Sequence, residues 1–299
     1  GLALAGLIGI YRFFTTTFKF NKIVALIAIV LPPSLLFWGS GLLKEGIVIF
    51  ALGMFVFGFS QIDINGKSIR PYITLTFSLL IFSISKFYVL LAIGPAIISY
   101  LILKRYNKPF VVFAGVHLVL YLAIFLLPLT EFFPNIPDVI SQKQNDFINF
   151  VQSLNHVGSY IETPKLTSNF LEFTWQGIRG FFVTLFRPHL LEVHNFAALP
   201  AALENFLTFG LLLVIPFGRN KAFQMKYLLF GISFTLILFA LAGMTTPVLG
   251  ALVRYKIPAQ PFLYAILLMS INWNSIQNRL KINLKNEKVK NYIFAKSSS

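Results

Sequence analysis

The amino-acid sequence predicts an all-α integral membrane protein, a bundle of about eight to nine transmembrane helices with one long external loop that contains an amphipathic helix. Two observations predict this fold class. Hydrophobic residues fill 57% of the 299 positions and charged residues only 12%, which is far outside the range of soluble domains. The basic residues behind the formal net charge of +15 fall in short groups between apolar stretches. This pattern is typical of cytoplasmic loops in membrane proteins.

A transmembrane helix needs about 20 mostly apolar residues, with roughly 17 to 25 tolerated. The first apolar run begins at residue 1 without an initiator methionine or a basic leader, so we expect the chain to lack upstream spans. One run, 72–86, is short, and an interfacial or bent helix is the alternative there. The predicted spans are 1–11, 23–43, 45–61, 72–86, 87–103, 110–129, 196–217, 227–249 and 257–273.

Short groups of Lys and Arg set the expected orientation, because basic loops stay on the cytoplasmic side. One group surrounds Arg12, others lie at 104–108 and 219–226, and the last is the basic tail 274–299. An even number of predicted spans separates each group from the next, so all four lie inside. We therefore expect a multi-pass protein with a cytoplasmic C-terminus, with the lipid bilayer as its partner and no nucleic acid.

Residues 130–195 form the long external loop on this count. Within it, "SQKQNDFINFVQSLNHVGSY" spaces apolar residues at helical intervals, which predicts an amphipathic helix on the membrane surface or on the other spans. Residues 181–194 contain Pro188, which a regular helix interior does not accept. A full span there would also move the third basic group outside, so we predict an interfacial or re-entrant segment.

No repeat or low-complexity linker divides the chain, so residues 1–299 are read as a single transmembrane domain. The sequence has no cysteine, which excludes disulfides and thiol nucleophiles. It also lacks a Walker motif and the GxGxxG, HExxH and GxSxG elements. ATP-driven transport and soluble-type hydrolysis are therefore unsupported.

Cations on the predicted outer face are the feature that points to a function, because basic residues outside run against the general trend. An anionic ligand such as a lipid-linked phosphate or pyrophosphate explains them, since Arg and Lys are the usual partners of phosphate oxygens. The polar residues gathered on this face are Lys44, Glu45, Lys86, Arg187, His189, Glu192, His194, Arg254 and Lys256.

Arg187 and Arg254 are the strongest phosphate-binding candidates, because a proline follows each of them closely and fixes the local backbone. A carboxylate is the usual group to act on an acceptor hydroxyl. We predict Glu45 and Glu192 as catalytic residues, and Glu204, within a predicted span, as a further carboxylate candidate. The full set of predicted phosphate-binding residues is Lys44, Arg187, His189, Arg254 and Lys256.

Simpler alternatives exist for each residue. Lys44 at a turn between spans can extend to the outer headgroups, while Glu45 favours the start of the next helix. His117, in mid-span, is expected to hydrogen-bond in helix packing. His189 and His194 lack further ligands at helical spacing, so no metal site is predicted. A divalent cation held by carboxylates and phosphate is the one cofactor left open.

Three segments carry a resemblance: "LPPSLLFWGSGLLKEGIVIF", "LFRPHLLEVHNFAALPAALENF" and "RYKIPAQPFLYAILL". They resemble bacterial polytopic proteins from cell-surface polysaccharide gene neighbourhoods, which look like GT-C-type membrane glycosyltransferases or O-antigen polymerase-like and ligase-like proteins. The last segment is similar to the end of many mannosyltransferase-like GT-C enzymes. In the GT-C pattern the catalytic carboxylate lies in the first external loop, and no residue of this chain matches it.

The resemblance implies a polyprenyl-phosphate-linked sugar as the donor and an inverting displacement at the outer face of the bacterial cytoplasmic membrane. A transporter or flippase for a lipid-linked saccharide or another anion is the alternative, as is a non-catalytic membrane subunit. Charges near one surface and the lack of a visible repeat favour the enzyme, because transporters commonly place charges at the midplane between inverted repeats.

Overall fold

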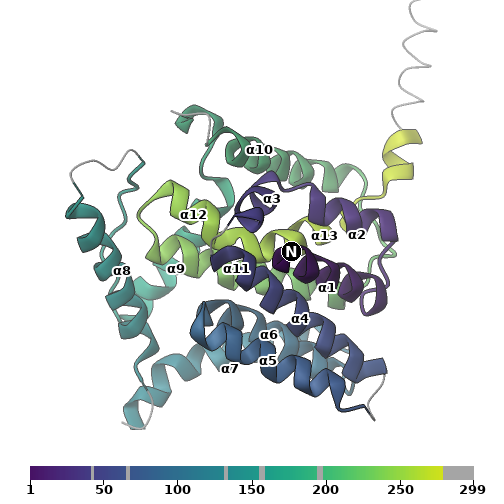
Figure 1. Cartoon of the computed structure of the whole chain (residues 1–299), viewed down its shortest axis with the longest axis horizontal. Coiled ribbons are helices and arrows are strands. Elements are labelled where there is room, and N and C mark those ends of the chain that lie inside the picture. The colour runs from purple at the N-terminus through teal and green to yellow at the C-terminus, as the bar shows by residue number, and fades with distance from the viewer. Residues whose placement is uncertain (42–43, 65–67, 131–133, 155–158, 194–197, 279–299) are drawn as a thin grey trace, which may run out of the picture.

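The computed structural model describes residues 1–278 apart from five short segments. The described part of the chain is mostly helical (Figure 1). No strand occurs in this described part beyond two isolated bridges, Tyr160 with Val248 and Arg219 with Ile271. The predicted all-α class is confirmed. His194 and the tail from 279 lie outside the described residues, as do the segments 42–43, 65–67, 131–133, 155–158 and 194–197.

Local sequence signals explain where the helices begin. Asn21, Asn135 and Asn169 each cap a helix by accepting a hydrogen bond from a backbone N–H of its first turn. The helices are α1 (Leu2–Thr16), α2 (Lys22–Val30), α3 (Pro33–Ser40), α4 (Lys44–Ile64), α5 (Arg70–Ile84), α6 (Phe87–Leu103), α7 (Pro109–Leu126), α8 (Ile136–Gln152), α9 (Phe170–Phe186), α10 (Leu199–Val214), α11 (Met225–Thr245), α12 (Leu249–Lys256) and α13 (Gln260–Ser270).

Four stretches are long and apolar enough to cross a membrane: Lys44–Ile62, Pro109–Thr130, Leu199–Phe217 and Met225–Thr245. On α7 Phe113 is the one buried residue, and many large apolar side chains are exposed: Phe110, Val111, Leu118, Val119, Leu122 and Leu126. An apolar helix with so much exposed surface suits a lipid environment and not water. The coarse prediction of a membrane-embedded helical protein is therefore confirmed.

The predicted number of eight to nine spans is not confirmed by helix length. The helices α1, α5 and α6 are apolar but only 15 to 17 residues long. The predicted span 23–43 is wrong as a single helix, because α2 and α3 meet at a bend of 65°. Two consecutive prolines, Pro32 and Pro33, lack the N–H groups that a continuous helix needs at this point.

Two other boundaries differ from the sequence prediction. Glu45 lies in the first turn of α4, as predicted, but Lys44 opens the helix and does not lie in a turn before it. The first part of the predicted interfacial or re-entrant segment 181–194 is helical, because α9 continues to Phe186. Arg187 is extended, as expected of a residue that precedes proline, so the helix ends at Phe186, two residues before Pro188. A short 3₁₀ turn follows at Leu190–Glu192.

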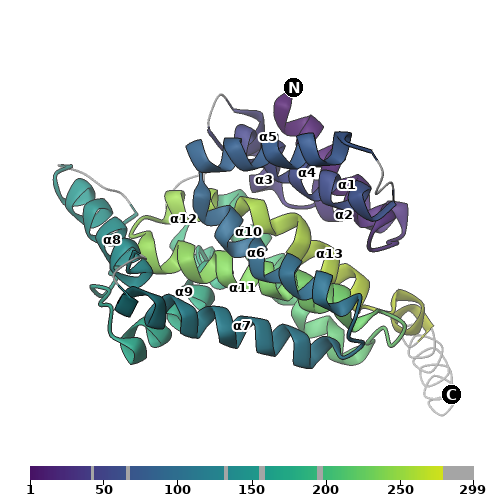
Figure 2. The same cartoon turned by 90° about the horizontal axis from the view of Figure 1, so that it is seen from below.

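The predicted amphipathic helix is present as α8, and it packs on the end of α11. Its buried Gln144 donates to the carbonyl oxygens of Met244 (2.7 Å) and Pro164 (3.0 Å) and accepts from the backbone N–H of Leu166 (2.7 Å). In Figure 2, α8 lies at one end of the bundle and the last described residues lie at the other.

Helix α12 lies toward the same end as α8 in both views (Figures 1 and 2). Backbone hydrogen bonds join the loop that follows α8 to the start of α12: Ile161 N–H donates to the Pro247 carbonyl (2.8 Å), and Leu249 N–H donates to the Ser159 carbonyl (3.0 Å). The segment after α8 therefore packs directly beside α12.

Glycines let two helix pairs approach closely. Gly53 on α4 faces the backbone of Gly6 on α1, and Gly243 on α11 faces that of Gly180 on α9. A Cβ atom at either Gly53 or Gly243 would overlap the opposite backbone. Without a hydrophobic driving force between helices in lipid, such close backbone packing is a main source of association.

We expect Gly53→Ala to lower the free energy of unfolding by about 1–3 kcal/mol, because the new methyl group forces α1 and α4 apart. Gly115→Ala is the matched control, since a Cβ atom there meets nothing within 4 Å. Thermal unfolding of the purified variants in detergent measures the difference. Equal stability of the two variants would show that α1 and α4 do not pack through Gly53.

Candidate functional site

Charged side chains gather around α12 in three clusters. The Glu45 cluster comprises Glu45, Lys86 and Arg254 with the rings of Trp38, Tyr88 and Tyr255. The Glu204 cluster comprises Ser34, Glu204, Asn205, Thr208, Lys256, Gln260 and Tyr264. The Arg187 cluster comprises Arg187, His189 and Glu192.

In the Glu45 cluster one carboxylate oxygen serves two cations. Oε1 of Glu45 accepts from Nζ of Lys86 (3.0 Å) and from Nε (3.1 Å) and Nη2 (2.8 Å) of Arg254. The Glu45 side chain is 2% exposed, whereas Arg254 is 32% exposed. Burial lowers the pKa of Lys86 below its ordinary value, and Glu45 offsets part of this shift. One carboxylate opposite two cations leaves the cluster with an excess of positive charge.

Two further polar atoms of this cluster make no hydrogen bond to the described residues. Oε2 of Glu45 and the Tyr88 hydroxyl are buried and have no hydrogen-bond partner among the described residues. Aromatic faces hold the cations: Nζ of Lys86 lies 4.5 Å from the centre of the Tyr255 ring, and the Arg254 guanidinium lies 5.2 Å from that of Trp38. The cluster thus offers positive charge, a free acceptor oxygen and a free donor hydroxyl.

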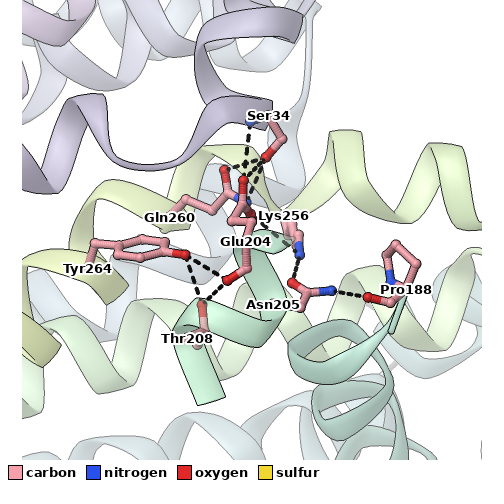
Figure 3. Close-up of polar contacts among 8 residues, drawn as sticks. All are labelled: Ser34, Pro188, Glu204, Asn205, Thr208, Lys256, Gln260 and Tyr264. Atoms are coloured by element: carbon pink, nitrogen blue, oxygen red, sulfur yellow. Dashed lines mark hydrogen bonds and ion pairs between the residues drawn. The ribbon is translucent and has the colours of Figure 1, made fainter. Parts of the chain in front are cut away.

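The Glu204 cluster is a buried ion pair surrounded by hydrogen bonds (Figure 3). Glu204 on α10 accepts from the backbone N–H (3.2 Å) and the hydroxyl of Ser34 and from the amide of Gln260, and lies 3.7 Å from Nζ of Lys256. Nζ of Lys256 also donates to Oδ1 of Asn205. Both charged side chains are 2% exposed. The pair joins α3, α10, α12 and α13.

The Arg187 cluster lies in the turn after α9. Nε of Arg187 donates to Oε1 of Glu192 (2.7 Å), and the backbone N–H of His189 donates to Oε2 (3.2 Å). Burial opposes ionisation, but these hydrogen bonds and the Arg187 charge outweigh it and lower the pKa of Glu192 below 4.5. The amide of Asn205 donates to the Pro188 carbonyl (2.9 Å), which connects this cluster to the Glu204 cluster.

The structure separates the predicted phosphate-binding residues into different environments. Arg254 meets Glu45, Lys256 meets Glu204, and both Arg187 and His189 meet Glu192. Lys44 is exposed at the start of α4, near enough to Lys86 to disfavour its charge. Burial explains the pairing, because a cation in a low-dielectric interior needs a carboxylate close by. Among the described residues, the Glu45 cluster pairs two Lys or Arg side chains with one carboxylate, whereas each of the other two clusters pairs one with one.

Several residues of the clusters were not predicted from the sequence. Tyr88, Tyr255 and Trp38 lie among the 16% of aromatic positions, and nothing in the sequence separates them from aromatic residues that face lipid. Ser34 and Gln260 each follow or precede a proline at a helix start, which is a signal for a helix boundary and not for a binding partner.

His117 has the packing role expected from the sequence. Its Nδ1 lies 2.7 Å from the Phe113 carbonyl and its Nε2 lies 2.7 Å from the Ser233 hydroxyl on α11. Because a carbonyl only accepts, Nδ1 donates and Nε2 accepts. Within the part of the chain that the structure describes, no three His, Cys, Asp or Glu side chains group as a metal site requires.

The fold and these clusters define a membrane-embedded helical protein with paired charges inside the bundle, toward the end that carries α8. No protein-family model matches the chain, and no curated protein or solved structure matches it either.

We expect Glu204→Ala to destabilise the protein by about 3–5 kcal/mol, because it leaves the Lys256 charge buried without its carboxylate. The double variant Glu204→Leu with Lys256→Met removes both charges and should recover most of the lost stability. Reversible unfolding in mixed detergents measures both values. If the double variant is less stable than Glu204→Ala, the two charges do not depend on each other.

The Glu192 contacts predict a pH-dependent contribution to stability. Since the folded-state pKa of Glu192 is lowered, this contribution is complete above about pH 4.5 and is lost as the pH falls through the folded-state pKa. A partly exposed pair contributes about 0.5–1 kcal/mol. Thermal unfolding between pH 6 and pH 3 should show a smaller acid-induced loss in Glu192→Gln than in the native protein. Identical pH profiles would contradict the prediction.

Proposed function

We propose that the protein is a membrane-embedded glycosyltransferase or polysaccharide polymerase-like enzyme that acts on a polyprenyl-phosphate-linked saccharide. The observation that supports this most directly is the Glu45 carboxylate, buried between two cations with one oxygen unused. A transferase for such a donor needs cations for the phosphate and a carboxylate for the acceptor. The Glu45 cluster contains both.

In the proposed reaction, Arg254 and Lys86 bind the donor phosphate. Oε2 of Glu45 takes the proton of an acceptor hydroxyl while the oxygen of that hydroxyl forms a bond to the anomeric carbon. The bond from the anomeric carbon to the phosphate oxygen breaks, and the configuration at that carbon inverts. The leaving polyprenyl phosphate gains a negative charge, which the two cations stabilise. The proton then leaves Glu45 for solvent.

This proposal gives the other predicted site residues different roles. Arg187, Lys256 and Glu192 already have partners, so they hold the backbone around α12 and leave phosphate binding to the Glu45 cluster. Exposed Lys44 adds positive charge beside Lys86. His189, 53% exposed, interacts with Glu192 and does not reach a second cluster through any ion pair among the described residues.

The proposed placement in the membrane follows the sequence prediction. The shorter helices α1, α5, α6 and α13 and the bent α2–α3 pair would complete the bundle of eight to nine spans with the four long ones. The end that carries α8 and α12 would then face the outside of the bacterial cytoplasmic membrane, and the C-terminal tail would face the cytoplasm.

A transporter or flippase for the same lipid-linked saccharide is the second candidate, and one observation favours it. The broken α2–α3 helix directs the backbone N–H of Ser34, the first N–H of α3, at a carboxylate in the bundle, Glu204, which pairs with Lys256. Discontinuous helices that end at buried charges are common in transporters. The enzyme remains our proposal because the carboxylate with an unused oxygen lies in the Glu45 cluster.

The test is transfer of a labelled sugar from a polyprenyl-phosphate donor by the purified protein in proteoliposomes. We expect Glu45→Gln and Arg254→Ala to reduce formation of the glycosidic product by about 10²-fold or more. Glu192→Gln and Arg187→Ala are the matched pair from the other Arg–Glu contact and should lose less than about tenfold.

Product formation that is equally sensitive to both pairs would place the reaction outside the Glu45 cluster. Movement of the labelled donor across the bilayer without a new glycosidic bond would support the transporter in place of the enzyme.

A further inference from the structure

Two buried polar atoms in the Glu45 cluster have no hydrogen-bond partner in the part of the chain that the structure describes, Oε2 of Glu45 and the hydroxyl of Tyr88. Native proteins satisfy nearly all such groups, so an exception calls for an explanation. The other buried side-chain oxygens without partners in the described residues are the hydroxyls of Ser99, Thr235 and Thr246, which belong to none of the three clusters. The orphaned atoms of the Glu45 cluster lie beside fixed charges.

The Tyr88 hydroxyl lies within the electrostatic reach of the whole cluster. The charges of Glu45 and Arg254 and the hydroxyl of Tyr255 all act on it. The Tyr88 and Tyr255 rings are 6.0 Å apart, and Nζ of Lys86 lies 5.8 Å from the centre of the Tyr88 ring. The ring that carries the unused donor and the carboxylate that carries the unused acceptor therefore both lie next to Lys86.

These atoms define a complementary ligand. A phenol donates to an anionic oxygen, and an ionised carboxylate oxygen accepts from a hydroxyl. Lys86 and Arg254 against Glu45 leave one positive charge, which matches the single negative charge of a phosphodiester. Arg254 is the most exposed of the three charged side chains, 32% against 12% for Lys86 and 2% for Glu45, so a ligand would meet it first.

We propose that Tyr88 is a ligand-binding residue that donates to a phosphodiester oxygen held by Lys86 and Arg254, while Oε2 of Glu45 accepts from a hydroxyl carried by the same ligand. The ligand class is a phosphodiester with a free hydroxyl close to the phosphate. This inference rests on the proposed function for the location of the site and adds the recognition of the ligand. Both a prenyl-phosphate-linked hexose and a phosphatidylglycerol headgroup have this chemistry.

The experiment measures binding without turnover, in detergent and in phosphatidylcholine nanodiscs. The probes are a short-chain prenyl phosphohexose, a short-chain phosphatidylglycerol and diethyl phosphate, which has the charge but no hydroxyl. We expect at least one hydroxylated probe to bind about tenfold more tightly than diethyl phosphate. Competition between the two hydroxylated probes identifies the source: the tighter one is the ligand of this site.

Tyr88→Phe separates ligand binding from a structural role. Because the Tyr88 hydroxyl has no partner among the described residues, its removal should leave the unfolding temperature unchanged or raised and weaken binding of the hydroxylated probe about tenfold. Tyr264→Phe is the matched control: this hydroxyl donates to the Glu204 carbonyl (2.9 Å) and lies 3.0 Å from the Thr208 hydroxyl, so its loss should lower stability and spare affinity.

The inference is overturned if Tyr88→Phe binds the probe as tightly as the native protein, or if it destabilises the protein as Tyr264→Phe does. It is also overturned if the native protein binds diethyl phosphate as well as both hydroxylated probes. Binding that depends on Tyr88 without sugar transfer refutes the proposed enzyme and leaves this inference standing. Sugar transfer at the native rate in Tyr88→Phe refutes this inference and leaves the proposed enzyme standing.

Discussion

Neutralisation of buried cations by carboxylates from other helices is the interaction on which this end of the bundle depends. Helix α12 has eight residues, too few to be stable by itself. Its position is fixed from two sides, by Arg254 with Glu45 of α4 and by Lys256 with Glu204 of α10. Removal of either carboxylate would leave a cation without a partner in an apolar interior, where the energetic cost is high.

The rest of the structure is consistent with this arrangement. Outward faces such as that of α7 are apolar, and close backbone contacts at Gly53 and Gly180 bring helices together without polar groups. The ion pairs around α12 lie instead where several helix ends come together. There the carboxylates bring together segments far apart in sequence, since Ser34 and Gln260 both bind Glu204. The loop after α8 adds backbone hydrogen bonds to the start of α12.

The sequence predicted the helical membrane fold and the charged residues, but not their pairing. Hydrophobic composition and loop charges are properties of single segments, so they revealed the apolar helices and the helix start at Glu45. The contact of Glu45 with Arg254 joins residues 209 positions apart, and no local pattern encodes it. For the same reason, the separation of Arg187 from Arg254 into different clusters could not be predicted. Tyr88 was missed because its hydroxyl is distinctive only through what surrounds it.

Arg254 and Lys256 are two residues apart on one helix, yet their carboxylate partners differ in how many of their oxygens are hydrogen-bonded. Every polar atom around Glu204 is bound, and such a saturated network favours one fixed geometry. Glu45 shares one oxygen between two cations and keeps the other unused. A side chain that binds or reacts with a ligand needs an atom free to contact it. The backbone that carries this side chain must also be fixed, since a group that shifts loses its alignment with the ligand. The Glu204 cluster fixes the position of α12, and the Glu45 cluster has a carboxylate oxygen without a partner among the described residues, which is why our proposal places the site at Glu45 and not at the Glu204–Lys256 pair.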